Sequence, residues 1–239
     1  MGRKYILLWF ESPLQAWGAD SKFGRRDSLK FPTKSGVLGL VCCALGARGE
    51  QKILLLEFSS LTQTVVSYAK APREPLLRDF HMVGSGYDDS DPWTTLHIPK
   101  KSDGSKAVGG GTKMTYRFYL QDARFAVVLE VPPSRADSIA EALQNPVYDL
   151  YMGRKTCVPT DFIYRGEYPT EDDALRQAEA IAAEKGLKED FRVVDGESEG
   201  ETLTLNDVPV HFGEIKKYRD RRVTIDRTST RLNSSHESP

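Results

Sequence analysis

The chain has 239 residues, a formal net charge of −1 at pH 7 and a composition that is 39% hydrophobic and 10% aromatic. These values exclude an intrinsically disordered chain and leave room for one large domain or two small ones. The longest apolar run, residues 37–45, is about half as long as a membrane-spanning helix, so no membrane association is expected.

The N-terminal part predicts a strand and a helix. Residues 4–12 are almost continuously apolar and predict a strand that is buried on both faces. Residues 33–47 predict a helix with Thr33 as its N-cap. Gly36 and Gly39 are expected to let this helix pack closely on a sheet.

Further strands are interrupted by a long insertion and a second helix. β-Branched, apolar or alternating runs predict strands at residues 61–69, 123–131 and 161–168. A segment at 84–112 is rich in Gly, Asp, Ser and Lys and has little periodicity. Residues 134–144 predict a helix with Ser134 as its cap.

This order predicts an α+β fold of the ferredoxin-like or RRM-like kind, in which two helices cover one face of an antiparallel sheet. A further helix is expected over 170–186, where Thr170 and Asp173 form a capping box. Three possible strands follow and either extend the sheet or form a smaller one, at 190–194, 201–205 and 208–215. The tail, residues 227–239, is expected to be disordered.

The small net charge hides an uneven distribution. Residues 1–165 contain 22 Lys and Arg against 17 Asp and Glu, residues 166–214 contain 4 against 14, and residues 215–239 contain 7 against 3. A mildly basic body permits an anionic polymer as partner, although a solvated surface of mixed charge is the simpler interpretation. The 3 cysteines form no CxxC pair, which predicts a reduced, cytoplasmic protein.

Lys34 and Ser35 stand at the start of the first predicted helix. The stretch lacks the glycine that precedes the lysine in a Walker A loop, so a P-loop is excluded. The backbone N–H groups of the first helical turn are still able to hold one phosphate. The alternative is that the neighbouring glycines and apolar residues only pack and that the Lys34 side chain is solvated.

Aromatic rings and cations interleave in three stretches. They are RDFHMVG at 78–84, GTKMTYRFYLQD at 111–122 and YMGRKTC at 151–157. Such mixtures suit single-stranded nucleic acid, because bases stack on rings while cations hold phosphates. Each stretch taken alone is also compatible with an ordinary loop or strand.

Five stretches occur in a distinctive order: SPLQAWG at 12–18, FPTKSGVLGLVCCALG at 31–46, LRDFHMVG at 77–84, YRFYLQDARFAVVLE at 116–130 and YMGRKTCVPT at 151–160. Together they resemble the Cas family-five proteins of type I-E Cascade, a CRISPR surveillance complex; the family is part of the RAMP superfamily. The resemblance runs from about residue 3 to 168.

The resemblance implies a palm of residues 1–77 and 118–226, with a C-terminal extension, and an inserted β-hairpin thumb of residues 78–117. It also implies a non-catalytic subunit, without cofactor or metal, that binds and caps the five-prime handle of the CRISPR RNA and supports antiviral targeting. Its implied partners are a backbone subunit of Cas family seven, the large subunit that reads the PAM and, indirectly, target DNA.

The resemblance and the interleaved rings and cations together give fifteen candidate RNA-binding residues. They are Gln15, Trp17, Arg25, Arg26, Lys34, Ser35, Arg78, His81, Lys113, Tyr116, Arg117, Tyr151, Gly153, Arg154 and Lys155. Lys155 stands where the family has arginine, so this position keeps the charge but loses the planar fork that binds phosphate with two hydrogen bonds.

Two other functions stay open on the sequence. Some family relatives of another subtype cleave CRISPR RNA without a metal, and His81, Lys113 and Tyr116 could supply the base and the cation for such a cleavage. The chain would then be a metal-independent endoribonuclease. Alternatively, it is a protein scaffold whose basic residues bind acidic neighbours.

Overall fold

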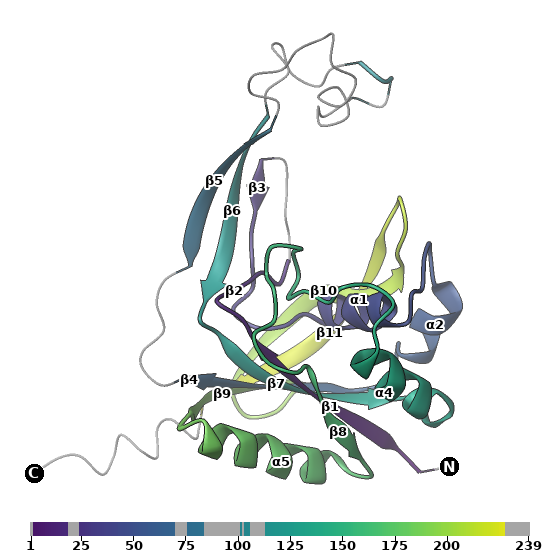
Figure 1. Cartoon of the computed structure of the whole chain (residues 1–239), viewed down its shortest axis with the longest axis vertical. Helices are drawn as coiled ribbons and strands as arrows, with labels where there is room; N and C mark the ends of the chain where they lie inside the picture. The colour runs from purple at the N-terminus through teal and green to yellow at the C-terminus, as the bar shows by residue number, and fades with distance from the viewer. Residues whose placement is uncertain are drawn as a thin grey trace, which may run out of the picture.

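The computed structural model describes residues 2–18, 24–69, 76–83, 101, 103–105 and 113–227. Its centre is a seven-stranded antiparallel sheet in the order β10-β11-β9-β4-β7-β1-β8 (Figure 1). The strands are β1 (Lys4–Glu11), β4 (Gln63–Ala69), β7 (Arg124–Val131), β8 (Tyr164–Tyr168), β9 (Lys188–Asp195), β10 (Glu201–His211) and β11 (Lys217–Asp226). The predicted disordered tail lies outside the described residues except for its first residue, Arg227.

Four strands of this sheet confirm the predicted ferredoxin-like plan. The order β4-β7-β1-β8, with helix α1 (Lys34–Ala44) after β1 and helix α4 (Ala136–Gln144) after β7, is the strand order that this plan requires. The open question about the C-terminal strands is also answered. They extend the first sheet, because β9 pairs with β4. The predicted strands at 201–205 and 208–215 are wrong in detail, since one strand, β10, runs from Glu201 to His211, and β11 was not predicted.

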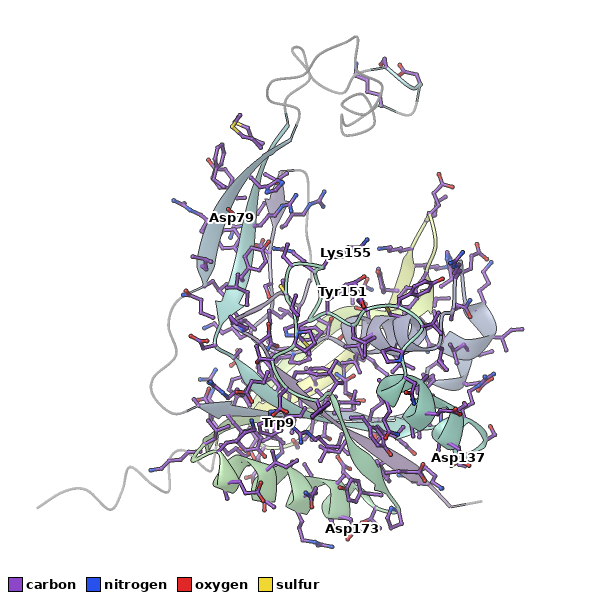
Figure 2. All side chains as sticks on the ribbon, in the orientation of Figure 1. Trp9, Asp79, Asp137, Tyr151, Lys155 and Asp173 are labelled. Carbon is purple, nitrogen blue, oxygen red and sulfur yellow. The ribbon has the colours of Figure 1, made fainter. Side chains whose placement is uncertain are left out.

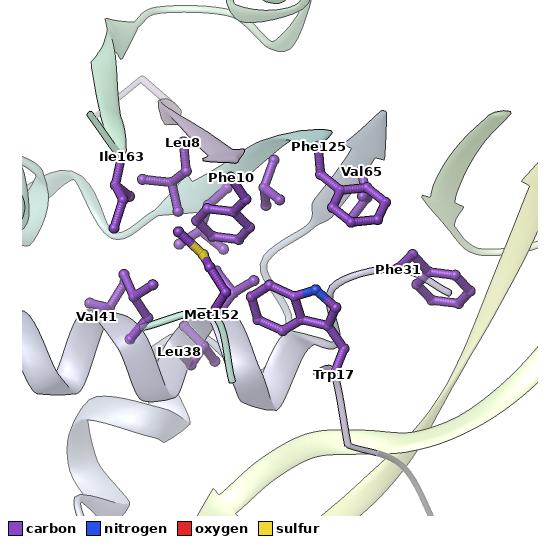
Figure 3. Packing of buried hydrophobic residues seen from close by; sticks show 14 of the residues in the cluster. Leu8, Phe10, Trp17, Phe31, Leu38, Val41, Val65, Phe125, Met152 and Ile163 are labelled. Atoms are coloured by element: carbon purple, nitrogen blue, oxygen red, sulfur yellow. The ribbon is translucent and has the colours of Figure 1, made fainter. Parts of the chain in front are cut away.

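Strand β1 is buried on both faces, as its apolar run predicts. Ile6, Leu8 and Phe10 belong to the larger core, which also contains buried residues of α1 and α4. Figure 3 shows Leu8 and Phe10 above Leu38 and Val41 of α1. Tyr5, Leu7 and Trp9 point the other way, into a second core that contains Ala174, Ala178 and Ile181 of helix α5 (Glu171–Glu184). Helices therefore cover both faces of the sheet, α1 and α4 on one side and α5 on the other.

Two of the three predicted helix N-caps, Thr33 and Thr170, are confirmed. The Thr33 side chain accepts a hydrogen bond from the Gly36 backbone N–H, and the Thr170 side chain accepts one from Asp173. The prediction for Ser134 is wrong. A short 3-10 turn, Pro133–Arg135, precedes α4 and makes Arg135 its N-cap, so Ser134 lies inside that turn. Helix α2 (Lys52–Glu57) was not predicted.

A buried charge network fastens the β10–β11 hairpin to the start of α1. Arg221 donates from Nε and NH2 to the two carboxylate oxygens of Asp207, at 2.7 and 2.9 Å, and also bonds Asp195. Asp207 in turn accepts the backbone N–H of Lys34 at 2.7 Å. An acidic side chain thus lies at the positive end of the helix, where it is stabilising.

A second, smaller sheet stands out from the first. Strands β5 (Leu77–Val83) and β6 (Lys113–Gln121) pair as an antiparallel hairpin (Figure 1). Strand β2 (Leu14–Gln15) pairs with the end of β6 at its base, and β3 (Arg25–Arg26) pairs with the middle of β6. Only Asp122 and Ala123 separate β6 from β7 of the main sheet. The Gln15 amide is fixed at this junction, where its Nε2 donates to Ala123 O at 2.7 Å.

Candidate nucleic-acid interface

The loop of residues 151–155 is locked to the segment around Ala16. Met152 is fully buried, and its carbonyl accepts the Ala16 N–H at 3.1 Å. Gly153 has φ +88°, and a Cβ added there would lie 1.7 Å from the carbonyl oxygen of Ala16. Only glycine fits this position, both for its left-handed backbone and for the close approach. This anchored loop carries Tyr151 and Lys155 (Figure 2) as well as Arg154.

Arg154 joins this loop to the base of the hairpin. Its guanidinium donates to Phe118 O on β6 at 3.2 Å and to Arg26 O on β3 at 2.9 Å. The same group lies 4.6 Å from the centre of the Tyr119 ring, a cation–π contact. Arg154 thus holds three segments together while it adds positive charge beside Arg26.

The hairpin has two different faces, because side chains alternate along its strands. One face carries Phe80 and Tyr116, whose rings are 5.5 Å apart, with Arg78 against the Tyr116 ring and Arg25 against the Phe118 ring. The other face carries Asp79, His81, Thr115, Arg117 and Tyr119, and Arg26 pairs in register with Arg117. Arg154 contacts this second face at the Tyr119 ring.

The proposed cleavage set does not share one face of the hairpin. His81 lies opposite Thr115 in the strand register, whereas Tyr116 lies opposite Phe80. His81 and Tyr116 therefore point to opposite sides of the two-stranded ribbon. Lys113 opens β6, and its side chain lies outside the part that the structure describes.

Three predicted RNA contacts are enclosed in the protein, so we assign them to the fold instead. The Gln15 side chain bonds Ala123 O and the indole N–H of Trp17. Trp17 is 1% exposed and stacks on Phe10 at 5.3 Å (Figure 3). Lys34 is 2% exposed, its ammonium donates to Leu61 O, and burial lowers its pKa. The backbone N–H of Lys34, a predicted phosphate donor, is taken by Asp207.

A groove is lined by five of the remaining candidates: Arg26, Ser35, Tyr151, Gly153 and Arg154. One part, of about 830 Å³, lies between Arg26, Ser35 and Arg154 on one side and residues 204–207 of β10 on the other. A neighbouring cavity of about 370 Å³ is lined by α1, Tyr151 and the β10–β11 hairpin. The two spaces share wall residues, among them Gly153 and Tyr218, so they lie next to each other, and we call them together the groove.

Sequence reasoning missed the far wall of this groove. Lys216 and Tyr218 of the β10–β11 hairpin line the same cavity as Tyr151. The run KKYRDRR at 216–222 carries the same mixture of ring and cations as the predicted stretches, and it was the signal available. Nothing in the sequence places it beside residue 151.

Other site types find little support among the described residues. No three His, Cys, Asp or Glu side chains of that part of the chain gather closely enough to hold a metal ion. No helix within the same ranges has the length and apolar character needed to cross a bilayer.

Comparison with known proteins gives consistent matches. The model of the family described as CRISPR-associated protein (Cas_Cas5) matches residues 5–224. The chain is 32% identical over 173 residues to the CRISPR system Cascade subunit CasD of Escherichia coli (strain K12), covering 71% of this chain and 74% of that protein.

Solved structures match over most of the chain. A chain of a structure titled "CRISPR RNA-guided surveillance complex" superposes with a TM-score of 0.70 at 29% identity, covering 92% of this chain and 88% of that one. A structure titled "Crystal structure of Cas protein" gives a TM-score of 0.57 at 24% identity over 95% and 96% of the two chains, which shows a shared fold.

Proposed function

Because the chain belongs to the Cas_Cas5 family of CRISPR-associated proteins, we propose that it is a non-catalytic subunit of a CRISPR RNA-guided surveillance complex and holds the five-prime handle of the CRISPR RNA. The observation that carries this proposal is the groove at the base of the hairpin, which is walled by Arg26, Arg154 and Tyr151. Cations and rings in one concave site are what a single RNA strand requires.

The groove favours backbone contacts over sequence reading. Arg26, in the groove wall, and Lys155, which follows the wall residue Arg154 in the sequence, are exposed cations and suit phosphates, while Tyr151 offers a ring for one base. Selection of the target is then left to base pairing between guide and DNA. In this proposal the hairpin of 78–117 is the thumb and the rest of the described chain is the palm.

The assembly partners follow from the proposal. We expect a backbone subunit of Cas family seven and the large PAM-reading subunit to contact this chain, with target DNA reached only through the guide. The setting is the cytoplasm. Support comes from the likeness to the Cascade subunit of Escherichia coli and to a chain of a surveillance complex.

Single alanine variants at the groove should weaken RNA binding for any spacer sequence. We expect Arg26→Ala and Lys155→Ala each to cost about 1–3 kcal/mol, or roughly 5- to 150-fold in affinity, because each removes a charged contact. Each should also reduce the slope of log affinity against log salt by about 0.7. Binding of the purified chain to synthetic handle RNA at several salt concentrations measures both effects.

A matched control is Arg176→Ala. Arg176 is an exposed arginine of α5, on the far side of the sheet, and it pairs with Asp173. This variant should leave affinity and salt slope unchanged. If affinity does not depend on salt and the groove variants bind like the unaltered chain, the RNA role is wrong and a protein scaffold becomes the better function.

An incubation with RNA separates the binding-only function from the endoribonuclease alternative. We expect the purified chain to leave CRISPR repeat RNA intact in EDTA, because His81 and Tyr116 lie on opposite faces of the hairpin and do not converge on one phosphate. A defined cut that disappears in His81→Ala would contradict the binding-only function.

A further inference from the structure

The cavity of about 370 Å³ runs along one stripe of helix α1. Gly36, Gly39, Leu40 and Cys43 line it, and their spacing is that of one helical face. The helix packs on the sheet with other residues, such as Val37 and Val41. The expectation that both glycines serve sheet packing is therefore wrong, since the glycine stripe faces the cavity.

The two glycines of this stripe differ. A Cβ at Gly36 would lie 2.8 Å from the Trp17 ring, so packing explains that glycine. A Cβ at Gly39 would meet nothing within 4 Å. A glycine inside a helix costs about 1 kcal/mol relative to alanine. No contact within the described chain offsets this cost at Gly39, but a ligand that approaches the bare helix backbone would.

The other walls of the cavity have the chemistry of a nucleotide site. Tyr151, Phe212 and Tyr218 line it and are half-buried, which leaves part of each residue accessible. Lys216, also in the lining, is exposed. The cavity shares wall residues with the neighbouring space that Arg26 and Arg154 line. Its volume is within the range of small-ligand sites, about 300–1,000 Å³.

We propose that this cavity receives one unpaired nucleotide of the RNA held in the groove. The base lies between the bare α1 backbone at Gly39 and the rings of the opposite wall, and the phosphate lies toward Lys216. This inference rests on the proposed function and adds to it a defined base position and two residues of the β10–β11 hairpin, Lys216 and Tyr218. The occupant is a single-stranded nucleotide, because a paired base cannot leave its helix without losing its partner.

The test uses the full chain and synthetic handle RNA in which each base in turn is replaced by the fluorescent base 2-aminopurine. With the unaltered chain, one position should change its emission on binding in a way that its neighbours do not. In Gly39→Leu the leucine side chain occupies the cavity, and leucine is a residue that an α-helix accommodates well. It should abolish that position-specific signal and weaken binding by about tenfold or more, the effect of losing one stacked base.

Two further variants and one control separate an effect on the cavity from an effect on folding. Gly39→Ala adds a Cβ that meets no protein atom, so its thermal midpoint should equal or exceed that of the unaltered chain while its affinity falls. Lys216→Ala should weaken binding and lower the salt slope but keep the position-specific signal. Ala180→Leu, on the exposed side of α5, controls for an added leucine and should change nothing.

Three outcomes decide the matter. Loss of the signal and of affinity in Gly39→Leu, with Ala180→Leu unaffected, supports the cavity as the nucleotide site. A Gly39→Leu variant that binds as tightly as the unaltered chain and keeps the signal overturns the inference, while weakened binding of Arg26→Ala in the same assay leaves the proposed function standing. Failure of the unaltered chain to bind the RNA at all overturns both.

Discussion

Arg221→Ala is expected to lower the free energy of unfolding by about 3–5 kcal/mol. The Arg221 side chain is 10% exposed and neutralises two carboxylates, Asp207 and Asp195. Its removal leaves both without their shared cation in a site where water replaces it poorly. Asp207 also holds the first N–H of α1, and Asp195 accepts the N–H of Gln63 on β4, so the loss spreads to both elements. Urea unfolding with an unchanged m value measures the effect.

The neighbouring arginine provides the control. Arg222 pairs with Glu197, but the two side chains are 66% and 59% exposed. Exposed pairs contribute little, so Arg222→Ala should cost less than about 1 kcal/mol. Arg221→Lys should fall between the two, because an ammonium keeps the charge but cannot donate the paired hydrogen bonds to Asp207. Equal costs for the two alanine variants would show that burial of the network does not matter.

Of all glycine-to-alanine substitutions near the candidate site, Gly153→Ala should lower stability and RNA affinity most. The added Cβ would overlap the carbonyl oxygen of Ala16, and alanine at φ +88° is itself strained. We expect a cost of at least about 3 kcal/mol in the free energy of unfolding. The loop must move, so Arg154 leaves Phe118 O and Arg26 O. RNA affinity should fall at least as far as in Arg154→Ala.

Gly49→Ala separates backbone strain from steric overlap. Gly49 has φ +78°, but a Cβ there meets nothing within 4 Å. Its replacement should cost only about 1–2 kcal/mol, the strain of a left-handed alanine, and should leave RNA binding intact. The argument for the loop would be wrong if Gly153→Ala were as mild as Gly49→Ala in both unfolding and RNA-binding measurements.

Local signals predicted much of the fold. The apolar run of β1 and the capping residues Thr33 and Thr170 act on their immediate neighbours, so the sequence alone reveals them. The seven-stranded extent of the sheet was left open, because nothing local says that β9 pairs with β4 rather than with its own neighbours. Helix α2 has six residues, too few for a helical period to stand out.

The candidate site was predictable where rings and cations stand together in the sequence, as at 151–155. The sequence does not show which residues of suitable type are enclosed in the fold. Gln15, Trp17 and Lys34 are the right residue types for RNA, yet hydrogen bonds and stacking within the chain use them. Lys216 and Tyr218 were missed for the converse reason. They line the groove only because the β10–β11 hairpin, which is distant in the sequence, packs beside α1.

The anchoring of the hairpin at Gln15 bears on how an RNA strand is engaged. The Gln15 amide holds Ala123 O, and Asp122 N–H donates to Pro13 O at 3.0 Å, so the link between β6 and β7 is clamped from the N-terminal segment. At this end the β5–β6 hairpin is therefore joined firmly to the main sheet. Under the proposed function, an RNA strand that enters the groove meets a hairpin already fixed at this junction, so little ordering entropy is spent at the moment of capture.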